Sequence, residues 1–598
     1  MRSILSFSFL FLVTSIFAAG DFQSRYQDLI ANKEKSGEGE RLHRLFDIRW
    51  EYLMMENPEF ATEVGYPGQN HRWTDLSLSA IERRKIDLKT PLTVLQSINR
   101  AKLTAADQLN HDLFRRDLEE SIDGSRFPNE YLQVTQLSGV QQDVAQMLES
   151  APDFGVKDFE DRVARLRAVP VLIDQVIALL EKGLAGGITP PRITLRDVPR
   201  QVENQVVAVT ASPLLQKFTN FPATIPELEW ARLRRDAEAA YTNEVVPAYR
   251  KLHQYLSESY VPKARESIAI ADMPQGKEWY AFNIRHRTTT GLSAEQIHAM
   301  GLAEVTRIRA EMEKVIRSTG FEGSFAEFSK YLQTDPRFFC TSAEELLREY
   351  RDIAKRADPE LIKLFGRLPR LPYGVLPVPA YAEQSQTTAY YSPGSLRSGR
   401  PGNFFANTYN LKVRPKWEME PLTLHEAVPG HHLQIAIAQE LEDLPEFRKH
   451  GGYTAFVEGW GLYAESLGSE MGFYRDPYAK FGQLTYEMWR AIRLVVDTGM
   501  HSMGWSRQKA IDFFKGNSSK PEHDIVVEID RYIVWPGQAL AYKIGELKIK
   551  ELRAFATKQL GDKFDVRAFH DELLRRGALP LDVLETHMKQ WVAAGGKS

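Results

Sequence analysis

The sequence predicts a mainly α-helical protein that contains one small β-sheet, and three observations support this fold class. In several long stretches, apolar residues recur at steps of three and four, which gives a helix one buried face. Two shorter stretches are instead rich in threonine and aromatic residues, as strands are. The chain shows neither an internal repeat nor a low-complexity linker, so we expect one folded unit after its first residues.

The composition is that of a globular protein with enough apolar material for a large core. Of the 598 residues, 43% are hydrophobic and 26% are charged. Lys plus Arg (76) and Asp plus Glu (79) nearly balance and leave a formal net charge of -3. A nucleic-acid-binding protein usually gathers a basic excess on one face, so we do not expect a nucleic-acid partner.

The N-terminal segment, residues 1–20, is predicted to be a secretory signal peptide. A short positive start precedes an apolar stretch from Ile4 to Phe17, and the small residues Ala18–Gly20 suit cleavage before Asp21. The stretch is too short to span a bilayer convincingly, so we expect no stable membrane insertion after cleavage. The mature protein would then be exported to the periplasm or the cell exterior. No cysteine follows the apolar stretch, so we expect no lipid-modified N-terminus.

Along the mature chain, four stretches show the clearest helical periodicity, and their charged residues fall on solvated faces. These stretches are Leu42–Met54, Phe159–Leu180, Leu228–Leu256 and Ala294–Ile316. Further on, Thr387–Tyr391 and Asn403–Tyr409 flank a segment rich in Gly, Pro and Ser, and they are predicted to be the two arms of a β-ribbon. We expect a single domain over 21–598, with a helical lobe at roughly 40–370 and a metal-bearing part at roughly 380–598.

The segment that follows the ribbon is rich in histidine and is the strongest functional signal. It reads His425-Glu426-Ala427-Val428-Pro429-Gly430-His431-His432. In the familiar zinc-peptidase signature His-Glu-x-x-His, two histidines four residues apart lie on one helix face with the glutamate beside them. Here the second histidine comes later. On a regular helix His431 would lie about 9 Å from His425 along the axis, too far to share a metal ion with it.

The Pro429-Gly430 pair offers a way to restore this geometry. Proline lacks a backbone donor and glycine permits unusual dihedral angles, so the helix is expected to bulge there. A looped-out insertion would bring a later histidine back beside the first. We predict His431 as the second metal ligand, since a Gly-His ending also occurs in known His-Glu peptidase motifs, and His432 as the alternative. An ordinary helix break with two surface histidines would bind no metal.

A helix predicted over Tyr453–Glu465 supplies the third metal ligand. Glu458 has apolar and aromatic neighbours on this helix, and a carboxylate in such surroundings is costly unless it is paired or binds metal. With two histidines it would complete a zinc site that leaves one position open for water. Glu465 could orient a ligand imidazole. Either acid could instead lie on the solvated face of an amphipathic helix.

These residues predict a hydrolytic reaction. Zinc lowers the pKa of its water and polarises the scissile carbonyl, while Glu426 acts as general base and passes the proton to the leaving amine. The oxyanion that forms needs a hydrogen-bond donor. Tyr532, in the helical stretch Ile529–Tyr542, is our choice for this donor, and Arg531 or His523 would contact the substrate. A tyrosine in an apolar helix can equally be a core residue.

A row of polar residues precedes this stretch. Arg493, Asp497 and His501 lie at steps of four, so they would form a polar line along one helix face. The row could be solvated, could be a structural network, or could support the metal site.

Several of these segments identify the chain as similar to a large bacterial family, domain of unknown function 885, over nearly the whole mature length. The eight-residue histidine segment is the most specific of them. The other matching segments are Gly183–Arg192, Ser398–Gly402, Glu458–Trp460 and Pro536–Leu540.

This family resembles, more distantly, the helical zinc peptidases that include angiotensin-converting enzyme and thimet oligopeptidase. The resemblance implies a two-lobed helical clamshell with a deep channel and a small β-sheet next to the zinc helix. It also implies that Phe404–Tyr409, with Phe405 and Asn407, pairs with the substrate backbone as an added strand would. Arg531-Tyr532 is similar to an Arg-Tyr pair of the converting enzyme whose tyrosine stabilises the oxyanion. His523 is similar to its substrate-binding histidine, although the spacing differs by one residue.

The sequence therefore predicts a zinc-dependent peptidase, carboxypeptidase-like or oligopeptidase-like, for short peptides, because a deep channel would exclude folded proteins. One alternative is a metal-dependent amidohydrolase for a non-protein amide, which would share the zinc and Glu426 but not the peptide-pairing strand. Another is an exported, non-catalytic binding protein on the same scaffold, although binding alone would not require Glu426 as a base.

Overall fold

The computed structural model describes residues 21–380, 382–384 and 386–597. The predicted signal peptide, residues 1–20, lies outside the described residues. Helices make up 69% of the structure and the sheet has three strands, so the predicted mainly α-helical class with one small sheet is confirmed. Among the described residues, every helix is too short or too polar to span a bilayer.

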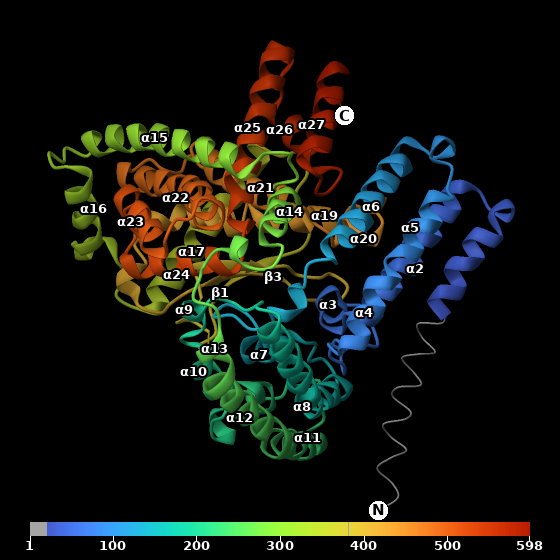
Figure 1. Cartoon of the computed structure of the whole chain (residues 1–598). Coiled ribbons are helices and arrows are strands. Elements are labelled where there is room, and N and C mark those ends of the chain that lie inside the picture. The colour runs from blue at the N-terminus through green and yellow to red at the C-terminus, as the bar shows by residue number, and fades with distance from the viewer. Residues whose placement is uncertain (1–20, 381, 385, 598) are drawn as a thin grey trace, which may run out of the picture.

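The helices fall into three groups that occupy different parts of the molecule (Figure 1). The N-terminal group packs around its own apolar cluster, which runs from Phe22 to Leu118. The predicted helical stretch Leu42–Met54 lies within α2, and its apolar residues form the buried face of that helix. This group contains α2 (Glu38–Glu56), α3 (Pro58–Val64), α4 (Leu78–Asp87), α5 (Lys89–Gln96) and α6 (Ala105–Gly124).

The second group surrounds a separate apolar cluster between Val134 and Ala264. Two π-helical turns widen its last long helix, and each comes just before a proline, Pro247 or Pro262, whose ring disturbs the preceding turn. The predicted stretches Phe159–Leu180 and Leu228–Leu256 are both helical. This group contains α7 (Val140–Ser150), α8 (Val156–Ala185), α9 (Arg192–Leu195), α10 (Val198–Glu203), α11 (Glu227–Ala240), α12 (Val246–Tyr255) and α13 (Val261–Lys263).

The third and largest group forms the main core. Its first four helices fall in the predicted first lobe, yet they share the apolar cluster of the metal-bearing part. These four are α14 (Gly276–Thr288), α15 (Ala294–Ser318), α16 (Phe325–Thr334) and α17 (Ala343–Ala357). The others are α18 (Met419–Glu426), α19 (His431–Gln439), α20 (Glu446–Lys449), α21 (Thr454–Leu467), α22 (Pro477–Ser502), α23 (Arg507–Asn517), α24 (Glu522–Val534), α25 (Ala541–Leu560), α26 (Val566–Leu574) and α27 (Leu581–Ala593).

Helix α22 lies at the centre of this group. Every residue from Phe481 to His501 is buried, which is the pattern of a helix surrounded by protein on all sides. The same stretch includes charged residues, and a buried charge is stable only when it is paired or hydrogen-bonded. The partners of these residues therefore lie on the helices around α22.

The sheet consists of β1 (Tyr373–Pro377), β2 (Ala389–Ser392) and β3 (Gly402–Ala406), in the order β1-β3-β2. Strands β2 and β3 are antiparallel, which confirms the predicted ribbon. Strand β1 pairs with β3 in parallel and was not predicted, because its sequence is short and flanked by prolines. As a result β3 is the central strand, with both of its edges occupied.

The loop between β2 and β3 reaches the N-terminal group. The Ser395 hydroxyl donates to the Val64 carbonyl at 3.2 Å, and Arg400 Nη2 donates to the Glu63 carbonyl at 3.0 Å. Both carbonyls belong to α3. The ribbon thus connects the sheet of the third group to the N-terminal helices.

Candidate metal centre

The histidine-rich segment forms two helices rather than one. Helix α18 ends at Glu426, and α19 begins at His431, so the expected bulge is a complete break. The connecting residues include a cis peptide bond between Val428 and Pro429. A side chain at Gly430 would overlap the carbonyl oxygen of His425, so this close backbone approach requires glycine.

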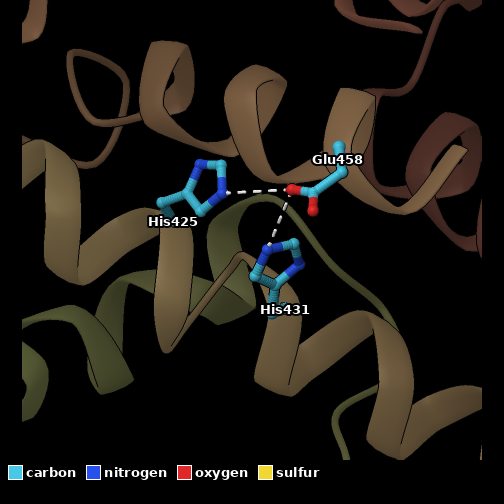
Figure 2. A group of neighbouring side chains, drawn as sticks. All are labelled: His425, His431 and Glu458. Carbon is cyan, nitrogen blue, oxygen red and sulfur yellow. Dashed lines mark ion pairs between the residues drawn. The ribbon is translucent and has the colours of Figure 1, made fainter. Parts of the chain in front are cut away.

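The break brings three side chains together. His425 Nε2 lies 3.6 Å and His431 Nε2 lies 3.4 Å from the same carboxylate oxygen of Glu458. The two imidazole rings are nearly perpendicular, with centroids 4.6 Å apart. Figure 2 shows the rings on either side of the break and Glu458 reaching them from α21.

These separations suit a zinc ion. All three ligand atoms lie within 4.8 Å of one another. A tetrahedral ion with bonds of about 2.0–2.1 Å holds neighbouring ligand atoms roughly 3.3 Å apart, close to the distances that Glu458 makes with each histidine. Two imidazoles and one carboxylate are also the donor set of catalytic zinc sites. The side chain of Glu458 is 18% exposed, so solvent reaches the site.

His425 is held with its Nε2 free to bind metal. Its Nδ1 lies 2.8 Å from the fully buried Glu465 carboxylate, which must accept the hydrogen bond. Arg490 Nη2 lies 3.3 Å from the same oxygen and fixes that carboxylate in turn. Burial opposes ionisation of His425, but the contacts with Glu458 and Glu465 outweigh it and raise its pKa to about 9. Glu465 therefore orients a candidate ligand, the role the sequence suggested for it.

His432 faces away from this centre, and both of its nitrogens have partners. Nε2 lies 3.0 Å from the Leu371 carbonyl, which can only accept, and Nδ1 accepts from the Tyr391 hydroxyl at 2.9 Å. Burial lowers the pKa of His432 to about 4, so the ring is neutral. The sequence left His431 and His432 as alternative ligands. In the structure His431 lies at the site, whereas His432 connects α19 to the sheet.

Glu426 lies beside the candidate ligands at the end of α18. It is 7% exposed, and its negative charge favours the protonated form of His425. Within the described part of the chain, neither of its carboxylate oxygens has a hydrogen-bond partner. A carboxylate that is nearly buried and not engaged is available to accept a proton.

Tyr532 does not fit the predicted role of oxyanion donor. It is 1% exposed, and its hydroxyl accepts hydrogen bonds from Trp489 Nε1 and Arg493 Nε, both at 2.8 Å. The hydroxyl is also hydrogen-bonded to the Glu528 carboxylate, so its own proton is already engaged. Burial raises the pKa of Tyr532 far above its ordinary value. The residue is part of the core, as its apolar helix allowed.

Tyr542 is the tyrosine that lies at the centre, and the sequence did not single it out. Its ring stacks against His425, with centroids 6.3 Å apart and planes 19° apart. The hydroxyl accepts from Arg531 Nη2 at 3.0 Å and from Gln538 Nε2 at 3.4 Å. These bonds leave the proton of the hydroxyl free to donate. The sequence signal was Pro536-Gly537, which turns the chain back so that residues after it face Arg531.

The polar row on α22 is a structural network. Arg493 binds the Tyr532 hydroxyl, and His501 Nε2 donates to the Tyr532 carbonyl at 2.9 Å. Both oxygens of Asp497 accept from the backbone N–H of Gly537 at 3.1 Å, where φ is +84°. The row therefore fixes α24 and the turn that leads to Tyr542, and it is buried rather than solvated.

Of the two substrate contacts expected from Phe404–Tyr409, the structure places Asn407 in the interior and Phe405 at a cavity. Asn407 is 1% exposed, and its amide donates to the carbonyls of Glu383, Gln386 and Thr387, so it stabilises the loop before β2. Phe405 does face a cavity, where its ring stacks on Tyr390. Strand β3 itself has no free edge for a peptide, since β1 and β2 flank it.

The cavity beside Phe405 has a volume of about 1410 Å³. Its lining includes residues of α7, α10, all three strands and α24. On α24 the lining residues include His523, which is exposed, Val527 and Asp530. A second cavity of about 780 Å³ shares Tyr390 with the first and reaches Val457, which adjoins Glu458. Together the two cavities extend along the sheet toward α21.

The sequence matches one described family. The family described as "Bacterial protein of unknown function (DUF885)" matches residues 58–588, a range that contains every residue of the candidate metal centre. A comparison with curated proteins finds no match.

Two solved structures are similar to this chain over almost its whole length. A crystal structure described as "the putative lipoprotein from Colwellia psychrerythraea" is 27% identical, with a TM-score of 0.88, and the alignment covers 93% of this chain and 100% of that one. A structure described as "a putative lipoprotein of unknown function from Shewanella oneidensis" is 17% identical, with a TM-score of 0.67, and covers 92% and 99%. The second shows the fold alone.

Proposed function

The chain belongs to the DUF885 family of bacterial proteins, and we propose that it is a zinc-dependent peptidase that hydrolyses short peptides. The observation that supports this most directly is the convergence of His425, His431 and Glu458 beside the unengaged carboxylate of Glu426. A metal site that served only to stabilise the fold would normally be closed by four protein ligands. Within the described residues, this one offers three.

Glu426 acts as the general base in this proposal. When bound, a zinc ion would supply Lewis acidity, which acidifies a water molecule and polarises a carbonyl group. Glu426 accepts the proton of the attacking water and returns it to the leaving amine. Glu465, held by Arg490, keeps His425 in one tautomer, because its hydrogen bond with Nδ1 requires the proton on that nitrogen.

Tyr542 replaces Tyr532 as the proposed oxyanion donor. Its hydroxyl retains a free proton, and the positive charge of Arg531 makes that proton a stronger donor. A donor that is already oriented stabilises the developing negative charge without reorganisation. We assign Arg531 and Gln538 to the positioning of this hydroxyl.

The cavities suit a short, extended chain. Aromatic rings of Tyr390 and Phe405 line the larger cavity, and residues of both outer strands, β1 and β2, line it as well and leave their outer edges for backbone pairing. We further propose that the protein is exported, because its N-terminal pattern is that of a signal peptide and the structure that is 27% identical is described as a "putative lipoprotein".

The test combines metal analysis with a peptide-library digest. We expect one zinc per chain and cleavage of short peptides by the purified wild type. Glu426→Gln should retain zinc but lose activity by about 10²–10⁴-fold, the usual contribution of a general base. Glu420→Gln is the matched control on the same helix, where Glu420 accepts from the backbone N–H of Tyr474 and pairs with Arg356 at 3.6 Å, and it should remain active.

Two results would overturn the proposal. Zinc with undiminished activity in Glu426→Gln would exclude the proposed base. Zinc with no cleavage of any peptide would instead favour the amidohydrolase or the non-catalytic binding protein, and hydrolysis of non-peptide amides would distinguish these two.

A further inference from the structure

The buried charged side chains beside the candidate metal centre carry more positive than negative charge. Arg493 Nη2 lies 3.0 Å from one oxygen of Glu528, and Arg531 Nη1 lies 3.6 Å from the other. Two guanidinium groups thus share one carboxylate. Their side chains are only 2% and 12% exposed, so solvent compensates little of the excess charge.

The neighbouring charged groups do not remove this excess. Arg490 is paired with Glu465, which is also bound to His425. The two remaining acids, Glu426 and Glu458, match the two charges of a divalent ion at the metal centre. One positive charge is therefore left over, and it falls on Arg531, whose contact with Glu528 is the longer one.

The side chain of Arg531 is held in one orientation, but one of its hydrogen-bond donors has no partner among the described residues. Its Nη2 donates to Gln538 Oε1 and to the Tyr542 hydroxyl, each at 3.0 Å. Its Nε is buried and has no partner among the described residues. A buried, unpaired guanidinium N–H is costly unless a ligand accepts from it. Both hydrogens of Nη2 are engaged, so Nε is left to donate one charge-assisted hydrogen bond to a carboxylate.

Arg531 lies between the larger cavity and the candidate metal centre. It follows Val527, a cavity-lining residue, by one turn of α24. On its other side it contacts Tyr542, which stacks on the candidate ligand His425. The larger cavity extends to Val527, one turn of α24 before Arg531, and the second cavity extends to Val457, next to Glu458.

We propose that Arg531 binds the free C-terminal carboxylate of the substrate, so that the enzyme cleaves near the C-terminus as a carboxypeptidase. The inference rests on the proposed peptidase function and adds the substrate class. The carboxylate supplies the negative charge that the cluster lacks and accepts from the unpartnered Nε. Arg531 then both binds substrate and orients Tyr542.

The test measures binding separately from hydrolysis. Zinc-loaded Glu426→Gln is titrated by calorimetry with an acetylated tetrapeptide that ends in a free acid and with the same peptide ending in an amide. We expect the acid to bind about 30-fold more tightly, as one charge-assisted pair allows. Adding Arg531→Gln should reduce this ratio to near one. Arg285→Gln, which removes a guanidinium paired with Asp123 on the surface, should leave the ratio unchanged.

Two binding results would overturn the inference. Equal affinity for the acid and the amide would exclude recognition of the carboxylate, and so would a preference that survives Arg531→Gln. A third peptide, an amide with glutamate as its last residue, distinguishes the terminal carboxylate from a side chain. If it bound as tightly as the acid, the terminal group would not be the ligand.

Hydrolysis by the wild type separates this inference from the function it rests on. Cleavage of acid and amide peptides at equal rates would support the peptidase and reject the carboxylate subsite. Cleavage of neither peptide, together with a preference for the acid in the binding experiment that depends on Arg531, would reject the peptidase and retain the subsite.

Discussion

At the scale of single residues, the metal centre depends on which histidine nitrogens are free. Glu465 engages Nδ1 of His425 and leaves Nε2, whereas both nitrogens of His432 have protein partners. The two adjacent histidines at the start of α19 thus have different roles, although the sequence makes them look equivalent.

This difference predicts the metal content of two variants. His431→Ala removes one of three ligands and should lose the zinc, whereas His432→Ala should retain about one zinc per chain. The second variant loses two hydrogen bonds to the sheet, so its free energy of unfolding should fall by about 1–3 kcal/mol. Metal analysis and urea unfolding measure both effects. Loss of zinc in His432→Ala alone would reverse the assignment.

Asp497 predicts a dependence of stability on pH. Burial raises its pKa from 3.8 to about 7. Between these values the folded protein holds a proton that the unfolded chain releases, so the contribution of this residue to the unfolding free energy falls as pH rises. Three pKa units correspond to at most about 4 kcal/mol. Between about pH 4 and pH 7, the free energy of unfolding measured in urea should fall less in Asp497→Asn than in the wild type. An equal fall with pH in the two proteins would contradict this.

At the scale of elements, the centre depends on how closely α21 approaches its neighbours. A side chain at Gly545 of α25 would overlap the carbonyl oxygen of Ala455 on α21, and one at Gly461 would meet the ring of His425. Glycine at 545 allows the two backbones to touch, and glycine at 461 leaves room for the imidazole of His425. Since Glu458 lies on α21, the spacing of these helices also sets the position of a candidate ligand.

Gly545→Ala should therefore affect both stability and metal binding. The added methyl group forces α25 away from α21, at a cost of about 1–3 kcal/mol or more in unfolding free energy. The displacement of Glu458 should weaken zinc affinity at the same time. Thermal unfolding and a zinc titration measure the two effects. Gly516→Ala, in α23, meets no atom within 4 Å and serves as the control that should lower neither quantity, since alanine is the better helix former.

The sequence predicted the features that depend on residues close together along the chain. Helical periodicity located the long helices, and the histidine segment with the acid of the following helix predicted a candidate ligand set that the structure brings together. It did not predict the place of β3 in the sheet, because β1 pairs with it from a distant segment. The burial of Asn407 and the approach of Tyr542 to His425 likewise depend on how separate segments fold together.

At the scale of the whole molecule, the candidate ligands come from three helices, α18, α19 and α21, that pack in the main core. An ion bound to all three would stabilise the folded state, because the unfolded chain has no such site. At a free ion concentration about 1,000 times the Kd, this stabilisation is about 4 kcal/mol.

Removal of the metal should therefore lower the Tm. A chelator should lower the Tm of the wild type, and added zinc should restore it. His431→Ala, measured in parallel, should show neither response. A chelator effect of equal size in the variant would mean that the metal is bound elsewhere.

Helix α22 has a further consequence for the proposed reaction. Arg490 fixes the partner of His425, Arg493 fixes α24, and Asp497 fixes the turn before Tyr542. These residues are spaced along one buried helix, so the distance from the candidate metal ligands to Arg531 cannot change unless the core deforms. Helix α22 therefore fixes this distance. Products released from the C-terminus would then have one length, whatever side chains the substrate carries.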